Sequence, residues 1–232
     1  MRGKVVLIAG GTGALGTELC LDFARQGCTV YATSRSGRHE KHLSDSLWNS
    51  VRILQADVTV EADVIRLFDR IIQESSCIDI VINTVGGYLP KKALSDVRLD
   101  EWNLMMESNL KTTFLLTREA LRRMKDRPYG RIINFSAMTG LQPTPGRIPY
   151  AISKHAVSML TELAATEVGG SAVTLNAIAP GIISTRANRT GASEEEARQW
   201  VSPSDIAELI RYLCSQAAGV INGTTIRLPG GS

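Results

Sequence analysis

The sequence predicts one α/β domain, in which helices flank both faces of a doubly wound parallel sheet. Short apolar runs rich in β-branched residues alternate with longer amphipathic segments. The apolar runs are nearly continuous, as is typical of strands that are buried on both faces of a parallel sheet. A length of 232 residues suits a single domain spanning 1–232, and no repeat, low-complexity tract or linker divides it.

The apolar runs predict about seven strands. They lie at residues 5–9, 29–33, 51–56, 78–82, 131–135, 173–178 and 225–228. Helices are expected at residues 14–26, 61–74, 99–125, 149–168 and 204–216. Because strands and helices alternate, right-handed βαβ crossovers are expected throughout.

Local signals support the helices and the loops between elements. Leu15, Leu19 and Phe23 recur at every fourth residue of the first helix, and Gly27 follows as a stop signal. The segment 99–125 is long enough for two helices or one bent helix. Residues 36–49 and 184–202 are expected to be loops, and the second, with its lone Trp200, is expected to form a short lid over the substrate.

Composition excludes several classes of protein. Lys and Arg total 26 against 23 Asp and Glu, and a net charge of +3 is too small for a nucleic-acid binder. No uncharged apolar run approaches the ~18 residues of a membrane span. Four cysteines without a C-x-x-C pair or a signal peptide predict reduced thiols and a cytoplasmic protein. His39 and His42 lack a third ligand nearby, so no metal site is expected.

A glycine-rich turn follows the first strand. Gly11, Gly13 and Gly16 fit the pattern G-x-G-x-x-G and open a helix. Glycines let the backbone approach a pyrophosphate, whose charge then meets the amides and the positive end of the helix. The pattern predicts a dinucleotide site formed by Gly10, Thr12, Gly13, Ala14, Leu15 and Gly16.

The end of the second strand favours NADP(H) over NAD(H). NAD sites place an acidic residue there to bind the ribose 2′-hydroxyl, but residues 29–38 contain none. Ser34 and Arg35 could instead bind a 2′-phosphate, with Arg38 as a further cation. The alternative is that Arg35 is simply a solvated surface residue.

Tyr150 and Lys154 are four residues apart on a predicted helix, so their side chains share one face. A nearby ammonium favours the phenolate, so Lys154 is expected to lower the pKa of Tyr150. Tyr150 would then donate a proton to a carbonyl as hydride arrives, or accept one in reverse. Lys154 could also bond the nicotinamide ribose, and both Tyr150 and Lys154 are expected among the cofactor-binding residues.

These motifs, in this order and over essentially the whole chain, resemble the short-chain dehydrogenase/reductase family. The resemblance implies a single Rossmann domain that binds NADP(H). It places Asp57 and Val58 at the adenine, Asn83 and Gly86 along the cofactor path, and Asn109 in a proton relay with Lys154 through a water. It also places a group of residues near the nicotinamide carboxamide: Pro180, Gly181, Ile182, Ile183 and Thr185.

One departure from the family concerns the catalytic serine. That residue usually lies thirteen positions before the tyrosine, where this chain has Ala137, and Ser136 is one residue earlier. A shift of one residue on an extended segment turns a side chain to the opposite face. Either the loop is locally re-registered and Ser136 is catalytic, or the site has no serine. Dihydropteridine reductases in the family lack this serine and share the motifs at residues 13–16 and 86–87.

The resemblance therefore implies an NADPH-dependent reductase of a carbonyl substrate, either a small molecule or a carrier-bound 3-oxoacyl group, since residues 176–181 resemble 3-oxoacyl-[acyl-carrier-protein] reductases. The alternatives are a serine-independent pteridine-type reductase and a catalytically decayed, NADP-binding regulatory protein. No nucleic acid or membrane partner is expected. The family habit implies a homo-oligomer, a tetramer or a dimer, with the helices at 99–125 and 149–168 between subunits.

Overall fold

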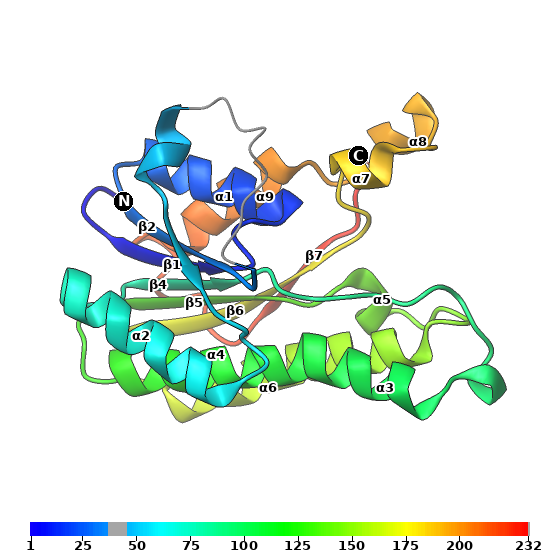
Figure 1. Cartoon of the computed structure of the whole chain (residues 1–232), viewed down its shortest axis with the longest axis horizontal. Helices are drawn as coiled ribbons and strands as arrows, with labels where there is room; N and C mark the ends of the chain where they lie inside the picture. The colour runs from blue at the N-terminus through cyan, green and yellow to red at the C-terminus, as the bar shows by residue number, and fades with distance from the viewer. Residues whose placement is uncertain (37–45, 232) are drawn as a thin grey trace.

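The computed structural model describes residues 1–36 and 46–231. Within these residues the chain forms one seven-stranded, wholly parallel sheet of order β3-β2-β1-β4-β5-β6-β7 (Figure 1). The strands are β1 (Val5–Ala9), β2 (Thr29–Ser34), β3 (Arg52–Gln55), β4 (Ile80–Asn83), β5 (Gly130–Phe135), β6 (Val173–Pro180) and β7 (Thr225–Leu228). The predicted fold class is confirmed, and the ends of the predicted strands differ from the observed ones by at most two residues.

Helices cover both faces of the sheet (Figure 1). One face carries α1 (Ala14–Arg25) and α9 (Pro203–Leu213), and the other carries α2 (Glu61–Ser75), α4 (Thr112–Met124) and α6 (Ile148–Glu167). Each face has its own cluster of buried apolar side chains, which meet opposite sides of the same strands. Burial on both sides explains why the strands read as continuous apolar runs.

The predicted helix at 99–125 is helical throughout but changes geometry in its middle. It consists of α3 (Leu99–Met105), the π-helical segment η3 (Met106–Lys111) and α4. The hydroxyls of Thr112 and Thr113 donate to the carbonyl oxygens of Ser108 (2.9 Å) and Asn109 (2.7 Å), which compensates for the changed backbone pairing. This segment holds Asn109 fully buried beside the long helix α6.

The expectation of a loop at residues 184–202 is wrong in part. Two short helices, α7 (Arg186–Arg189) and α8 (Glu194–Arg198), lie in this segment. The hydroxyl of Ser193 accepts from the amide of Glu196, whose carboxylate accepts from the amide of Ser193. This capping box was visible in the sequence as Ser followed by Glu three residues later.

Several further short helices were not predicted: η1 (Ser46–Ser50), η2 (Leu94–Asp96) and α5 (Met138–Leu141). The first falls at the end of the expected 36–49 loop, of which residues 37–45, including Arg38, His39 and His42, lie outside the described residues. All four cysteines are free thiols, as expected. Within the described part of the chain, no helix is both long and apolar enough to cross a bilayer.

The strand order fixes where a site can form. β1 pairs with β2 on one side and with β4 on the other, so the crossovers leave β1 and β4 in opposite directions. At such a switch point the loops that follow the two strands diverge and leave a crevice at the carboxyl ends of the strands. The glycine turn follows β1 and residues 84–88 follow β4, so both border this crevice.

Candidate active site

A cavity of about 730 Å³ lies at the carboxyl ends of the strands. It runs from the start of α1 to the start of α6, and the segment at 180–200 forms its other wall. Residues from the first turn of α1, the segment after β4, the tyrosine–lysine pair and the segment after β6 meet there, whereas Ser34, Arg35, Asp57, Val58 and Asn109 do not line it. Its lining comprises Leu15, Thr84, Gly86, Gly87, Tyr88, Lys91, Phe135, Ser136, Ala137, Thr139, Thr144, Arg147, Tyr150, Lys154, Pro180, Gly181, Ile182, Ile183, Thr185, Asn188 and Trp200.

The glycine turn forms one end of the cavity through close backbone packing. Gly10 has a φ of +75°, and its amide donates to the hydroxyl of Thr33 at 2.9 Å. A Cβ atom on Gly16 would lie 2.2 Å from the carbonyl oxygen of Gly10, so only glycine fits without backbone movement. The turn therefore brings the start of α1 directly against the end of β1.

The start of α1 is open to an anion. Its N-cap, Gly13, has no side chain to accept from the first amides, and the first turn holds no acidic residue. Gly13 and Ala14 are exposed, and Thr12 and Leu15 are half-buried. Unpaired amides and the positive helix end suit a pyrophosphate, so the observed turn fits the predicted dinucleotide.

The residues that the sequence predicts at the adenine lie near the ends of β2 and β3. Ser34 ends β2 and is buried, whereas Arg35 is exposed. The Asp57 carboxylate accepts from the amide and the hydroxyl of Thr59, at 2.9 and 2.7 Å. These two bonds lower the pKa of Asp57, and the nearby Arg35 guanidinium lowers it further. Arg35 therefore lies close enough to Asp57 for its charge to act on this carboxylate.

The turn after β4 is held by Asn83. This buried side chain donates to the hydroxyl of Thr113 at 3.0 Å and accepts from the amide of Val85 at 3.1 Å. A Cβ on Gly86 would lie 2.8 Å from Asn109 Oδ1 and 3.1 Å from Lys154 Nζ. The missing side chain at Gly86 thus leaves room for these two polar groups.

Lys154 is buried without an acidic partner among the described residues. Its ammonium donates to the carbonyl oxygen of Phe135 at 2.8 Å, and burial lowers the pKa of Lys154 to about 8. Asn109 lies next to it, donating to the hydroxyl of Ser153 at 3.0 Å and accepting from the amide of Gly87 at 2.9 Å. Asn109 and Lys154, more than forty positions apart in the sequence, therefore meet beside Gly86.

Tyr150 lines the cavity one helical turn before Lys154, but its pKa differs from the expectation. Burial raises the pKa of Tyr150, and the cation that opposes this rise is Arg147. The Lys154 ammonium donates to the carbonyl oxygen of Phe135. The prediction that Lys154 lowers the pKa of Tyr150 is wrong in this structure, since Arg147 is the cation that lowers it and burial outweighs its effect. The phenol is consequently protonated at neutral pH.

Ser136 has both hydrogen-bonding partners on α6. Its hydroxyl donates to the carbonyl oxygen of Lys154 and accepts from the hydroxyl of Ser158, both at 2.8 Å. The side chain is 2% exposed. Ala137, at the family's usual serine position, also lines the cavity. The hydroxyl of Ser136 thus holds β5 against α6.

The predicted carboxamide-binding segment forms the wall opposite α6. The amide of Gly181 donates to the carbonyl oxygen of Leu228 at 2.8 Å, which joins the end of β6 to β7. The amide of Val201 donates to the carbonyl oxygen of Ile182 at 2.9 Å, and Thr185 caps α7. Pro180, Gly181, Ile182, Ile183 and Thr185 all line the cavity, as do Asn188 and Trp200.

Sequence reasoning missed the residues at the mouth near Tyr150. The ring of Tyr88 meets the ring of Tyr150 edge-on, with centroids 6.4 Å apart. The Arg147 guanidinium lies 5.1 Å from the Tyr88 ring centre and donates to the carbonyl oxygen of Leu89 at 2.9 Å. No sequence motif marks Tyr88 or Arg147. Arg147 lies three residues before Tyr150, so Arg147 and Tyr150 are both at the start of α6.

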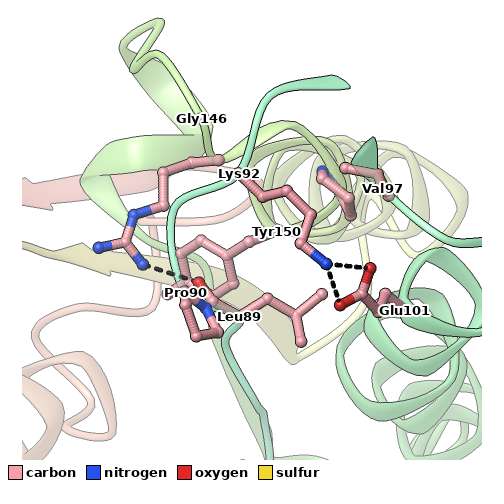
Figure 2. Close-up of a pocket in the computed structure, with 9 residues that line it drawn as sticks. Leu89, Pro90, Lys92, Val97, Glu101, Gly146 and Tyr150 are labelled. Carbon is pink, nitrogen blue, oxygen red and sulfur yellow. Dashed lines mark hydrogen bonds and ion pairs between the residues drawn. The ribbon is translucent and has the colours of Figure 1, made fainter. Parts of the chain in front are cut away.

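A second, smaller cavity of about 120 Å³ lies on the other side of Tyr150 (Figure 2). Figure 2 shows the ammonium of Lys92 turned to the carboxylate of Glu101, which it meets at 2.6 and 2.8 Å. Leu89, Pro90 and Val97 add apolar walls. Tyr150 and Arg147 line both cavities and so form the partition between them.

Comparison with known proteins places this geometry in context. The family model described as short chain dehydrogenase matches residues 4–196. A 3-oxoacyl-[acyl-carrier-protein] reductase FabG of Aquifex aeolicus is 30% identical, covering 100% of this chain and 98% of that protein. A short-chain type dehydrogenase/reductase of Picea abies is also 30% identical, covering 100% and 93%.

Solved structures give the same picture. The structure titled ElxO with NADP bound is 30% identical and superposes with a TM-score of 0.91, covering 99% of this chain and 98% of that one. A tyrosine-to-phenylalanine variant of the same protein, with NADPH bound, matches equally well.

Proposed function

The chain belongs to the short chain dehydrogenase family, and on that premise we propose that it is an NADPH-dependent reductase that converts a carbonyl to an alcohol, or catalyses the reverse oxidation. One observation carries the proposal. A single cavity connects the open N-terminus of α1 with Tyr150, and the buried Lys154 lies beside Asn109 along the same cavity. A dinucleotide site and a proton donor are thus joined in one space.

NADP(H) is supported by the residues at the far end of this cavity. The amides at Ala14 and Leu15, at the start of α1, would hold the pyrophosphate. Ser34 and the exposed Arg35 would bind the 2′-phosphate, with Asp57 beside the adenine. When bound, the nicotinamide supplies or accepts the hydride. The two ElxO structures, which hold NADP and NADPH, support the same choice.

Tyr150 is proposed as the general acid in the direction of reduction. Because burial raises its pKa, the hydroxyl holds its proton at neutral pH and can donate it to a carbonyl oxygen. Lys154 and Asn109, which meet beside Gly86, would return a proton through water.

We further propose that this reaction proceeds without a serine. Both hydrogen bonds of the Ser136 hydroxyl are made to α6, and Ala137 occupies the position where the family carries serine. This observation keeps a serine-independent pteridine-type reductase as the second candidate function. A decayed regulatory protein is less well supported, because Tyr150 and Lys154 line one cavity with Asn109 beside Lys154. A buried lysine without an acidic partner among the described residues is also costly to retain without use.

The substrate proposal rests on the relatives. FabG proteins that match the whole chain are 3-oxoacyl-[acyl-carrier-protein] reductases, so a 3-oxoacyl thioester is the first substrate to test. Exposed apolar side chains on α4 and α6, at Phe114, Ile152, Met159 and Leu163, support the proposal of a homodimer or homotetramer. Size-exclusion chromatography with light scattering would test that assembly.

The proposed function is tested by following NADPH consumption with a panel of ketones, 3-oxoacyl thioesters and a quinonoid dihydropterin. The proposal predicts turnover of at least one ketone or oxoacyl substrate, to a single enantiomer of the alcohol, and slower turnover with NADH. Turnover of the pterin alone would establish the second candidate. Tight NADPH binding without turnover of any substrate would instead support the decayed regulatory protein.

A further inference from the structure

The charges that line the large cavity all have one sign. Among the described lining residues, Lys91, Arg147 and Lys154 are cationic, and none is acidic. Lys154 is buried at the catalytic end, whereas Lys91 and Arg147 lie at the mouth beside Tyr88. The cavity therefore favours a ligand that brings negative charge to the mouth.

The neighbouring Lys92, by comparison, has an acidic partner within the protein. Its ammonium is held between both carboxylate oxygens of Glu101 and faces the smaller cavity (Figure 2). By contrast, no carboxylate among the described residues forms an ion pair with Lys91 or Arg147. The two adjacent lysines thus differ: Glu101 neutralises Lys92, whereas Lys91 lines the cleft without an ion-pair partner among the described residues.

Arg147 is held in place rather than loosely exposed. It donates to the carbonyl oxygen of Leu89 at 2.9 Å and stacks over Tyr88 at 5.1 Å. The amide of Lys92 donates to the carbonyl oxygen of Gly146 at 2.9 Å, which fixes the two segments against each other. The guanidinium is therefore pre-positioned at the mouth, with donors left over for a ligand.

The position of Arg147 is unfavourable for the helix that it begins. Arg147 is the N-cap residue of α6, which has 20 residues. A cation at the positive end of a helix is destabilising, whereas an anion there is stabilising. A bound anion would relieve both this repulsion and the lack of an acidic partner.

We propose that the substrate carries an anionic group, a carboxylate or a phosphoryl group, which Arg147 and Lys91 bind at the mouth while the carbonyl meets Tyr150. This inference rests on the proposed reduction. Arg147 offers a planar fork for two parallel hydrogen bonds, and Lys91 adds a point charge. The phosphates of the cofactor are assigned to α1 and Arg35 at the opposite end, so they do not account for these cations.

The anionic group takes no part in the bond changes. Hydride adds to the carbonyl carbon, the C=O π-bond opens, and the proton of Tyr150 goes to the oxygen. The product is the alcohol that still carries the carboxylate or phosphoryl group. Binding at the mouth therefore acts on substrate affinity and orientation, so its loss should raise KM more than it lowers kcat.

The test compares substrates that differ only in charge. One pair is acetoacetate and its methyl ester, and the other is acetoacetyl-phosphopantetheine and acetoacetyl-pantetheine. The variants are Arg147→Met, Arg147→Lys and Lys91→Met, and Lys125→Met is the control because it removes one exposed positive charge away from the cavity. Arg147→Met should lower kcat/KM for a charged substrate at least 30-fold, mainly through KM, and for its neutral partner less than threefold.

Lys91→Met should cost the charged substrate about fivefold, Arg147→Lys should retain part of the preference, and Lys125→Met should change neither. A preference confined to the first pair identifies a carboxylate, and one confined to the second identifies the phosphoryl group of a carrier arm. Equal losses for charged and neutral substrates, or no loss for either, would overturn the inference. The first of these results would make Arg147 a positioning residue for Tyr150.

Binding separates this inference from the proposed function. Titration calorimetry of the NADP⁺-loaded protein with 3-hydroxybutyrate and its methyl ester needs no turnover. Binding of the acid that weakens with added salt and disappears in Arg147→Met supports the anion site even if no substrate is reduced. Equal affinity for acid and ester, together with equal affinity for phosphopantetheine and pantetheine titrated in the same way, would overturn the site even if neutral ketones are reduced efficiently.

Discussion

The two ends of the cavity are built from different parts of the chain. At the glycine turn, main-chain atoms form the site: Gly10 adopts a positive φ, and Gly16 packs against it with no room for a side chain. At the other end, side chains do the work, and Tyr150, Lys154 and Asn109 come from two helices. Backbone packing therefore defines the end at the glycine turn, whereas polar and ionisable side chains define the end at Tyr150.

This difference decides how each end responds to change. A backbone cradle is sensitive to added volume, since the neighbouring atoms are main chain and cannot rotate away. A side-chain cluster is sensitive to the removal of single polar atoms, because each buried polar group needs its hydrogen-bond partners. Substitutions at the two ends should therefore separate cofactor affinity from turnover.

The sharpest test of this separation is Tyr150→Phe. Loss of the proton donor should lower kcat by about 10³-fold, while the NADPH dissociation constant stays within threefold. Tyr88→Phe is the matched control, because it keeps the edge-on ring contact and should retain kcat within fivefold. Stopped-flow and fluorescence titration measure the two quantities. Near-normal turnover of Tyr150→Phe would remove the proposed mechanism.

At the other end, Gly16→Ala should act on affinity. The new Cβ would lie 2.2 Å from the carbonyl oxygen of Gly10 and 2.7 Å from Gly11 Cα, so the turn must open. The NADPH dissociation constant should rise at least 100-fold, and overpacking should lower the free energy of unfolding by about 1–3 kcal/mol. Gly169→Ala, with its nearest atom 3.3 Å away, is the control. A change confined to kcat would break the comparison.

The buried ammonium of Lys154 predicts a pH dependence of stability. Its pKa is lowered from 10.5 to about 8, so between these values the unfolded chain binds a proton that the folded protein does not. Stability of the wild-type protein should therefore rise with pH across this window, relative to Lys154→Met, by up to about 3 kcal/mol. Urea unfolding of both proteins from pH 7 to 10.5 measures the difference. A constant difference would show that Lys154 titrates normally.

The preference for NADPH over NADH tests whether charge also contributes to cofactor affinity at the end formed by the glycine turn. Arg35→Asp should raise the NADPH dissociation constant by roughly 10- to 50-fold, since a carboxylate replaces a charge-assisted phosphate contact. NADH serves as the internal control, and its affinity should be unchanged or improved. Equal effects on both cofactors, or NADH binding more tightly than NADPH to the wild-type protein, would contradict the proposed role.

The smallest expected effect is that of Ser136→Ala. If its hydroxyl only joins β5 to α6, the variant should lose about 1–2 kcal/mol of unfolding free energy and keep kcat within fivefold. Ser158→Ala removes the partner hydroxyl and should behave alike. A loss of 100-fold or more in kcat for Ser136→Ala alone would make that serine catalytic and exclude the serine-independent reaction.

The sequence predicted what is local. The strands were recognisable because both faces are buried, and the glycine turn because its steric demand falls on consecutive residues. The partner of Lys154 was not predictable, because Phe135 is 19 positions away and contributes only a carbonyl oxygen. The raised pKa of Tyr150 was likewise missed, since it depends on burial by distant segments. Arg147 carries no motif, and its importance comes from what lines the cavity around it.

The π-helical segment at Met106–Lys111 has a consequence for how this scaffold tolerates length change. Such a segment accommodates one residue more than an α-helix of the same span, so it behaves as a stored insertion. Deleting one residue there would restore regular α-helical geometry and give one continuous, more rigid helix. The same deletion would rotate Asn109 away from Gly86 and Lys154. The π-helical geometry therefore makes the helix less regular but keeps Asn109 beside the cleft.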